Sequence, residues 1–159
     1  MVDLKGAAFL KEIRSINWFE KSGIPNEKYH MIFSLYEACD TWGKRYMDVW
    51  EPRICALEAA ASEKIGDDAV DEAFDAVSAA IGDVVWEKFG GYIERQHLGE
   101  ETAVSFELFD MIKRDMAWAY VEKLLDMPGF FTMLTDIYRQ GYFPCSWKGE
   151  YPSGQAVVL

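Results

Sequence analysis

Apolar residues recur at helical spacing along most of the chain, and the densest pattern lies in residues 101–127. At roughly 100° per residue, apolar side chains fall on most sides of this stretch. Only Glu107, Asp110 and Arg114 group into a narrow polar strip. A helix that is apolar on most sides must be covered by other helices. The pattern therefore predicts a central helix that ends at the Pro-Gly pair 128–129.

Further amphipathic stretches are expected to pack around this central helix. They cover residues 4–20, 27–50, 52–65, 67–97 and 130–140. Pro52 suits the first turn of a helix, so the second and third stretches are predicted to be separate helices. Gly90 and Gly91 mark a kink or interruption in the fourth. The pattern as a whole predicts an all-α fold: one domain over residues 1–159, a bundle of about six helices.

The last part of the chain, residues 141–159, has a different character. Tyr151, Pro152, Ser153 and Gly154 supply turn chemistry, and residues 156–159 are rich in valine and favour an extended conformation. We expect a short β-hairpin or an extended strand, packed on the helices.

Composition limits the class of protein. The chain has 159 residues, of which 50% are hydrophobic, enough for one domain with a substantial core. No apolar run is long enough to cross a bilayer, and the first residues do not resemble a signal peptide. Cys39, Cys55 and Cys145 are odd in number and lack CxxC spacing, which favours a reducing cytoplasm. We place Cys39 and Cys55 in the core.

The charge of the chain points to a particular kind of partner. Sixteen Lys and Arg residues stand against 27 Asp and Glu residues, giving a net charge of −11. Such a chain repels phosphate backbones, so binding to DNA or RNA is disfavoured. A cationic partner is favoured instead, because long-range attraction would steer it to the surface.

Most of this charge is concentrated in residues 58–87, which contain nine acidic residues and one basic residue, Lys64. On the predicted helix 67–97, the acids lie opposite an apolar stripe that includes Val70, Val77 and Ile81. We call these acids the acidic ridge: Asp68, Asp71, Glu72, Asp75, Asp83 and Glu87. A solvated polar face and a docking surface for a basic partner are both compatible with this pattern. The scarcity of Lys or Arg one turn away favours docking.

Two acids of the central helix lie off its polar strip. Asp115 and Glu122 are seven residues apart and therefore lie on one side of the helix. They suit either a buried carboxylate pair for acid–base chemistry or metal binding, or a side that meets solvent or an arginine of another helix.

The two histidines both follow the spacing E-x-x-H, in Glu27–His30 and Glu94–His97. Paired motifs of this kind supply metal ligands in ferritin-like di-iron bundles. Here the helical spacing turns both motifs away from the apolar faces. We therefore expect two surface histidines, with no metal site, no cofactor and no catalytic residue. Fingerprints of hydrolases and nucleotide-binding proteins are absent from the sequence.

The tail has an unusual combination of aromatic, glycine, proline and cysteine residues: Gly141, Phe143, Pro144, Cys145, Trp147, Gly149, Tyr151, Pro152 and Gly154. In these residues it resembles the C-terminal ending of small acidic bacterial immunity proteins, which protect cells from polymorphic toxins. Such proteins include the partners of contact-dependent growth inhibition toxins. The match covers about 19 of the 159 residues. The resemblance implies a non-enzymatic cytosolic protein that masks the active site of a cognate toxin domain in a one-to-one complex.

Charge and resemblance together favour neutralisation of a cationic toxin domain, an RNase by preference. Candidate aromatic anchors are Trp147 and Tyr151 in the tail and Trp86 near the acidic ridge, although each also suits packing within its own fold. Two alternatives remain: a helical metal-dependent enzyme that uses the E-x-x-H pairs, and an acidic regulator that mimics nucleic acid.

Overall fold

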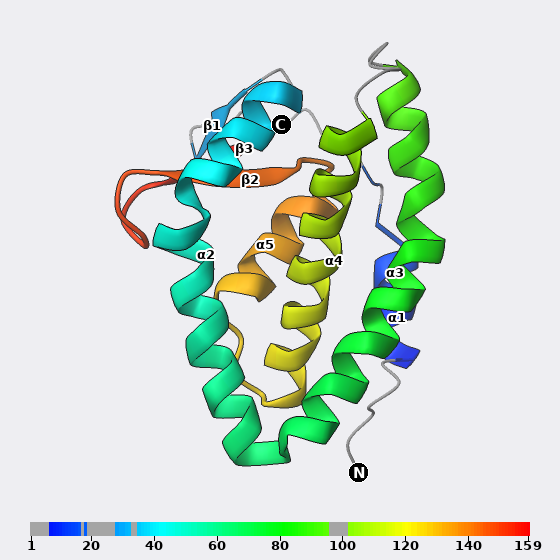
Figure 1. The fold of residues 1–159 in the computed structure, drawn as a ribbon, viewed down its shortest axis with the longest axis vertical. Coiled ribbons are helices and arrows are strands. Elements are labelled where there is room, and N and C mark those ends of the chain that lie inside the picture. Colours follow the sequence, from blue (N-terminus) through cyan, green and yellow to red (C-terminus); the bar gives the residue numbers. More distant parts are fainter. Residues whose placement is uncertain (1–6, 17, 19–27, 33–34, 96–101) are drawn as a thin grey trace.

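The protein is mostly helical, with a small three-stranded sheet near the C-terminus (Figure 1). The structure, a computed structural model, describes residues 7–16, 18, 28–32, 35–95 and 102–159. For residues 35, 39, 83–84, 86–95 and 102–108 it describes the backbone alone. The described elements are α1 (Ala7–Arg14), β1 (Tyr29–Met31), α2 (Leu35–Ile65), α3 (Asp67–Arg95), α4 (Thr102–Leu124), α5 (Phe130–Arg139), β2 (Pro144–Lys148) and β3 (Gln155–Val158).

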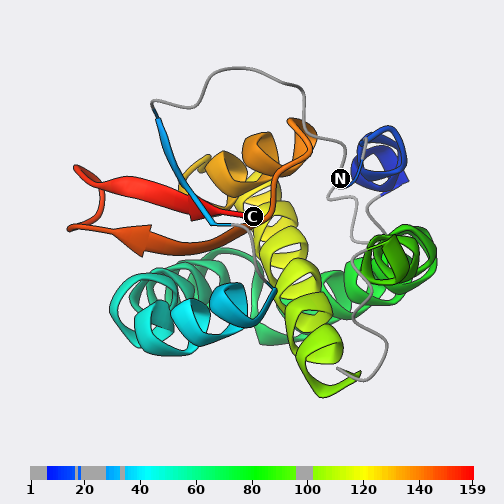
Figure 2. The same cartoon turned by 90° about the horizontal axis from the view of Figure 1, so that it is seen from above.

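The predicted central helix is α4, which packs against α2, α3 and α5 (Figures 1 and 2). From Phe109 to Leu125 the chain buries side chains on most of its circumference, while Asp110 and Arg114 remain exposed as predicted. The helix ends at Leu124, three residues before the predicted end. The apolar pattern on most sides was sufficient to place this helix at the centre, because each apolar side must be covered by another helix.

Two predicted helices, 27–50 and 52–65, are replaced by a strand and one long helix. The helix α2 runs unbroken through Pro52, so the predicted boundary at that residue is wrong. A proline inside a helix removes one hydrogen bond. The buried side chains of Val49, Trp50 and Leu57 on either side of it hold the helix together by packing against the core.

Residues 29–31 form the strand β1 where the apolar spacing predicted a helix. Tyr29, His30 and Met31 pair in parallel with Ala156, Val157 and Val158 of β3. The edge of β3 offers backbone partners that the local pattern cannot reveal, so tertiary context overrides helical spacing here.

The other predicted helices are present in the structure, but their bounds differ from the predicted ones. The described α1 covers only the middle of the predicted segment 4–20, and α3 continues through Gly90 and Gly91 without interruption. Because 27–50 and 52–65 merge, the described residues contain five helices where about six were predicted.

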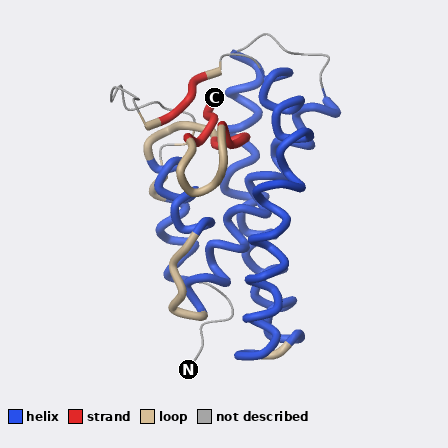
Figure 3. The backbone as a smooth tube through the Cα atoms, turned by 90° about the vertical axis from the view of Figure 1, so that its left-hand side faces the viewer, coloured by secondary structure: helices blue, strands red, loops and turns tan. Residues whose placement is uncertain are grey.

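The predicted tail structure is confirmed and extended by the sheet. Its strand order is β1-β3-β2, with β2 and β3 forming an antiparallel hairpin. Figure 3 shows the strands gathered toward one end of the helices. The last residues, from Ala156 to Leu159, are all buried. These last four residues are therefore part of the core.

Gly154 gives a direct test of how tightly the hairpin is closed. A Cβ atom at this position would overlap the Lys148 carbonyl oxygen and lie 2.7 Å from Trp147 Nε1. We expect Gly154→Ala to lower the free energy of unfolding by about 2–4 kcal/mol, because backbone must shift to admit the methyl group.

Gly43 in α2 is the matched control, since apart from the neighbouring backbone of its own helix no described atom lies within 4 Å of the place that a Cβ atom would take there. Gly43→Ala should raise stability by about 0.5–1 kcal/mol, because alanine is the better helix former. Urea denaturation of both variants measures the difference. Equal effects of the two substitutions would contradict this description of the hairpin.

Candidate functional site

The described side chains of the acidic ridge lie on the outward side of α3. The inward side buries Val70, Val77 and Ile81 against the core, as the sequence predicted, and Ala73 with them. Four acids of the acidic ridge have exposed side chains: Asp68, Asp71, Glu72 and Asp75. Asp83 and Glu87 belong to the same helix, but their side chains lie outside the described residues.

No lysine or arginine among the described side chains forms an ion pair with these four exposed carboxylates. The ion pairs found among those side chains use other acids: Glu12, Asp40, Asp48, Asp110 and Asp136. Lys64, the single base of residues 58–87, places its Nζ atom 3.3 Å from the Met127 sulfur. The described part of the acidic ridge is therefore a row of like charges facing solvent.

The predicted aromatic anchors have different surroundings. Trp147 is only 6% exposed and contacts the rings of Phe130 and Tyr151. Tyr151 is half-buried, and the side chain of Trp86 lies outside the described residues. Because Trp147 packs inside its own fold, it leaves little surface for a partner.

Asp115 is fully buried and accepts two hydrogen bonds from side chains of neighbouring helices. Trp50 Nε1 donates to Oδ1 at 3.0 Å, and the Tyr138 hydroxyl donates to Oδ2 at 2.7 Å. Burial raises the Asp115 pKa to about 7, although the two hydrogen bonds and Arg114 favour the charged form. Burial and the neighbouring Asp115 also raise the pKa of Tyr138, so this phenol stays protonated and donates.

Glu122 is also buried, at 4% exposure, and its carboxylate closes the start of α5. Oε1 accepts hydrogen bonds from the backbone N–H of Gly129 and of Thr132 and from the Thr132 hydroxyl, at 3.0, 2.7 and 2.7 Å. Oε2 accepts from the backbone N–H of Phe131 at 3.1 Å. The residue before α5, Gly129, supplies no side-chain cap, so Glu122 takes that role from another helix.

Within the described part of the chain, neither carboxylate meets solvent or forms an ion pair with an arginine, contrary to the simpler expectation for this side of α4. Their partners are indole, phenol, hydroxyl and backbone donors, and both are nearly inaccessible. We therefore assign Asp115 and Glu122 to the support of the fold.

Of the two E-x-x-H pairs, His30 alone has a described side chain. His30 is exposed and lies in the strand β1, outside any helix. Glu27 and His97, and the side chain of Glu94, lie outside the described residues. Across the residues that the structure describes, no group of three His, Cys, Asp or Glu side chains is placed to hold a metal ion.

The two cysteines whose side chains are described do not form a nucleophile pair with a described histidine. Cys55 is exposed, so its predicted place in the core is wrong, and the Cys39 side chain lies outside the described residues. Cys145 is buried, and burial raises the pKa of its thiol well above the usual range. Such a thiol stays protonated and unreactive.

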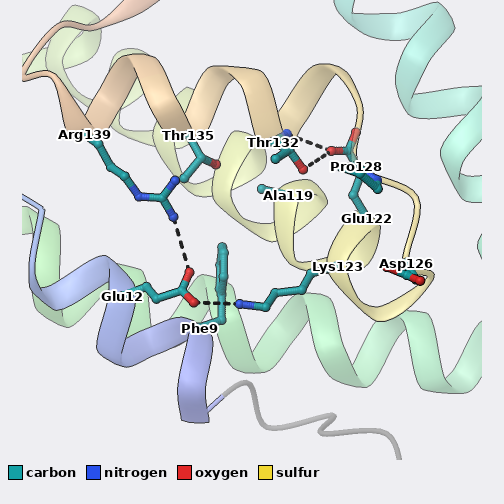
Figure 4. A pocket seen from close by; sticks show the side chains of 10 residues that line it. All are labelled: Phe9, Glu12, Ala119, Glu122, Lys123, Asp126, Pro128, Thr132, Thr135 and Arg139. Atoms are coloured by element: carbon teal, nitrogen blue, oxygen red, sulfur yellow. Dashed lines mark hydrogen bonds and ion pairs between the residues drawn. The ribbon is translucent and has the colours of Figure 1, made fainter.

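A cavity of about 260 Å³ lies among α1, α4 and α5 (Figure 4). Phe9 and Ala119 line its apolar part. Among its lining residues, Glu12 of α1 forms ion pairs with Lys123 of α4 at 2.7 Å and with Arg139 of α5 at 3.3 Å. These three charged groups therefore satisfy one another and tie α1 to α4 and α5.

Sequence reasoning missed one cluster, around Arg45 and Arg53 of α2 and Tyr151 of the tail. Placing a helix boundary at Pro52 put the two arginines on separate helices. A continuous helix places them eight residues apart, about two turns. That spacing is the signal that the sequence contained.

Comparison with protein-family models, with curated proteins and with solved structures finds no match for this chain. None of the helices in the described ranges combines the length and apolar character needed to cross a membrane.

Proposed function

We propose that this protein is an immunity protein, which binds a cationic toxin domain one-to-one through the acidic ridge and thereby neutralises it. The observation that carries the proposal is the row of exposed carboxylates at Asp68, Asp71, Glu72 and Asp75, without a cation from the described side chains. The helix beneath them is anchored by its buried inner face.

The physical reason is electrostatic. Like charges three or four residues apart on a helix repel by a few tenths of a kcal/mol per pair. A partner that supplies Lys and Arg removes this repulsion and is attracted from a distance. A nuclease must be cationic where it grips phosphates, so such a toxin, an RNase by preference, suits the acidic ridge.

The resemblance of the tail supports the class of protein rather than the location of the contact. Trp147 and Cys145 are buried, and Gly154 allows the close approach of Lys148. The matching residues therefore shape the hairpin. In this proposal they belong to the scaffold, and α3 provides the binding surface.

Charge reversal on α3 tests the proposal. A candidate toxin domain is to be sought in the genes next to this one. It is then co-expressed with the wild type or with the triple variant Asp68→Lys, Asp71→Lys, Asp75→Lys. We expect the wild type to bind and restore growth, and the triple variant to bind at least about 100-fold more weakly, because attraction becomes repulsion. Calorimetry and a growth assay measure both effects.

The matched control reverses Asp40, Asp48 and Asp110, which are exposed and belong to α2 and α4 rather than to α3. Each reversal adds two charges, so both triple variants move the net charge from −11 to −5. The control should keep binding within about tenfold, since only long-range attraction is weakened. Equal losses in the two variants, or full protection by the α3 variant, would overturn the acidic ridge as the contact surface.

A further inference from the structure

A second hollow, of about 350 Å³, lies between α2 and the turn that joins β2 to β3. Its lining includes two arginines of α2, Arg45 and Arg53, the ring of Tyr151, and the acids Asp48 and Glu150. Two arginines lining one hollow stand out in a chain of net charge −11. The acidic ridge does not include any of these residues.

Among the described side chains, Arg53 is a cation without a carboxylate partner. Its Nη1 donates to the Val49 carbonyl oxygen at 3.0 Å, and its guanidinium carbon lies 4.0 Å from the centre of the Tyr151 ring. No described carboxylate comes within ion-pair distance of it, although two acids line the same hollow. Its Nε is buried and finds no acceptor among the described residues.

Arg45 lines the same hollow. Its Nη2 donates to the Gly149 carbonyl oxygen at 2.8 Å, and its Nη1 lies 3.6 Å from the Asp48 carboxylate. That distance is too long for a good hydrogen bond. Its Nε also lacks an acceptor in the described part of the chain. Both guanidinium groups are thus positioned by backbone carbonyls and an aromatic ring and retain N–H donors that the described residues do not satisfy.

This arrangement suits an acidic ligand of low charge. A guanidinium group presents a planar fork that matches a carboxylate, and stacking on an aromatic ring reduces the entropy lost on binding. The two acids at the rim make the formal charge of the lining zero, which disfavours a multiply charged phosphate. The same acids can accept hydrogen bonds from an ammonium or hydroxyl group next to the carboxylate.

We propose that Arg53 and Arg45, with the Tyr151 ring as platform, bind the carboxylate of a small amino acid or hydroxy acid. Glu150 and Asp48 receive the adjacent ammonium or hydroxyl group. This site is independent of the proposed immunity function, so the Lys triple variant of α3 retains it.

Titration followed by NMR tests the assignment on the full chain. Glycine, acetate and inorganic phosphate are added separately, up to about 50 mM, while the arginine Nε–H and Tyr151 ring signals are recorded. Glycine should give saturable shifts at Arg53 and Tyr151 and bind more tightly than acetate, with phosphate weakest. The exposed Arg14 of α1 reports nonspecific ion effects.

Substitutions complete the test. Arg53→Lys keeps the charge but loses the fork, and should weaken glycine binding at least about fivefold. Glu150→Gln should weaken glycine binding while leaving acetate binding equal or stronger, an outcome that a merely structural Arg53 would not produce. Absence of saturable shifts at Arg53, or equal shifts at Arg14, would overturn the site. Tightest binding by phosphate would overturn the carboxylate assignment.

Discussion

Glu122→Gln is expected to lower the free energy of unfolding by about 2–4 kcal/mol, among the largest effects of any single substitution in this protein. The wild-type carboxylate accepts four hydrogen bonds at the start of α5. The amide of glutamine keeps one acceptor oxygen and turns an N–H donor toward another donor. It also removes the negative charge that interacts favourably with the helix N-terminus.

Glu12→Gln is the matched control for this prediction. Glu12 is partly exposed and forms ion pairs with Lys123 and Arg139 at the surface, so its replacement should cost at most about 1 kcal/mol. Urea denaturation at neutral pH measures both variants. The capping role assigned to Glu122 is wrong if its variant loses no more stability than the control.

The second large effect is a dependence of stability on pH that originates at Asp115. An ordinary aspartate side chain has a pKa of 3.8, whereas the pKa of Asp115 in the folded protein is about 7. Between these values the folded protein holds a proton that the unfolded chain has released. The contribution of this proton to stability is therefore complete below about pH 4 and is lost as the pH rises through 7. Such a shift corresponds to on the order of 4 kcal/mol.

Asp115→Asn isolates this contribution, because asparagine cannot titrate. The stability of the wild type relative to the variant should fall by several kcal/mol between about pH 4 and pH 8. Asp110→Asn, on the exposed side of the same helix, should show no comparable trend. Chemical denaturation across this range measures the differences. A difference between wild type and Asp115→Asn that is constant with pH would contradict a buried, protonated Asp115.

The acidic ridge shows how a local pattern can place a surface correctly. The apolar stripe through Val70, Val77 and Ile81 has the period of a helix and carries enough apolar area to determine the buried side of α3. The side opposite must then face solvent. Asp71 and Asp75 are exposed for that reason, and no knowledge of the neighbouring helices was needed.

The positions of Asp115 and Glu122 show where such reasoning stops. Helical spacing placed both acids on one side of α4 but could not identify their partners. Trp50 lies 65 residues from Asp115, and the donors to Glu122 belong to the start of the next helix. A carboxylate looks the same in the sequence whether it faces water or backbone N–H groups, because its partners are set by packing.

The sequence by itself determined the central helix, the two faces of α3 and the extended tail, since each follows from a short-range pattern of residues. Only the tertiary structure decided that residues 29–31 join β3, that α2 continues through Pro52, and that Arg53 stacks on Tyr151. These features depend on contacts between segments far apart in the chain, whose free energy outweighs local preference.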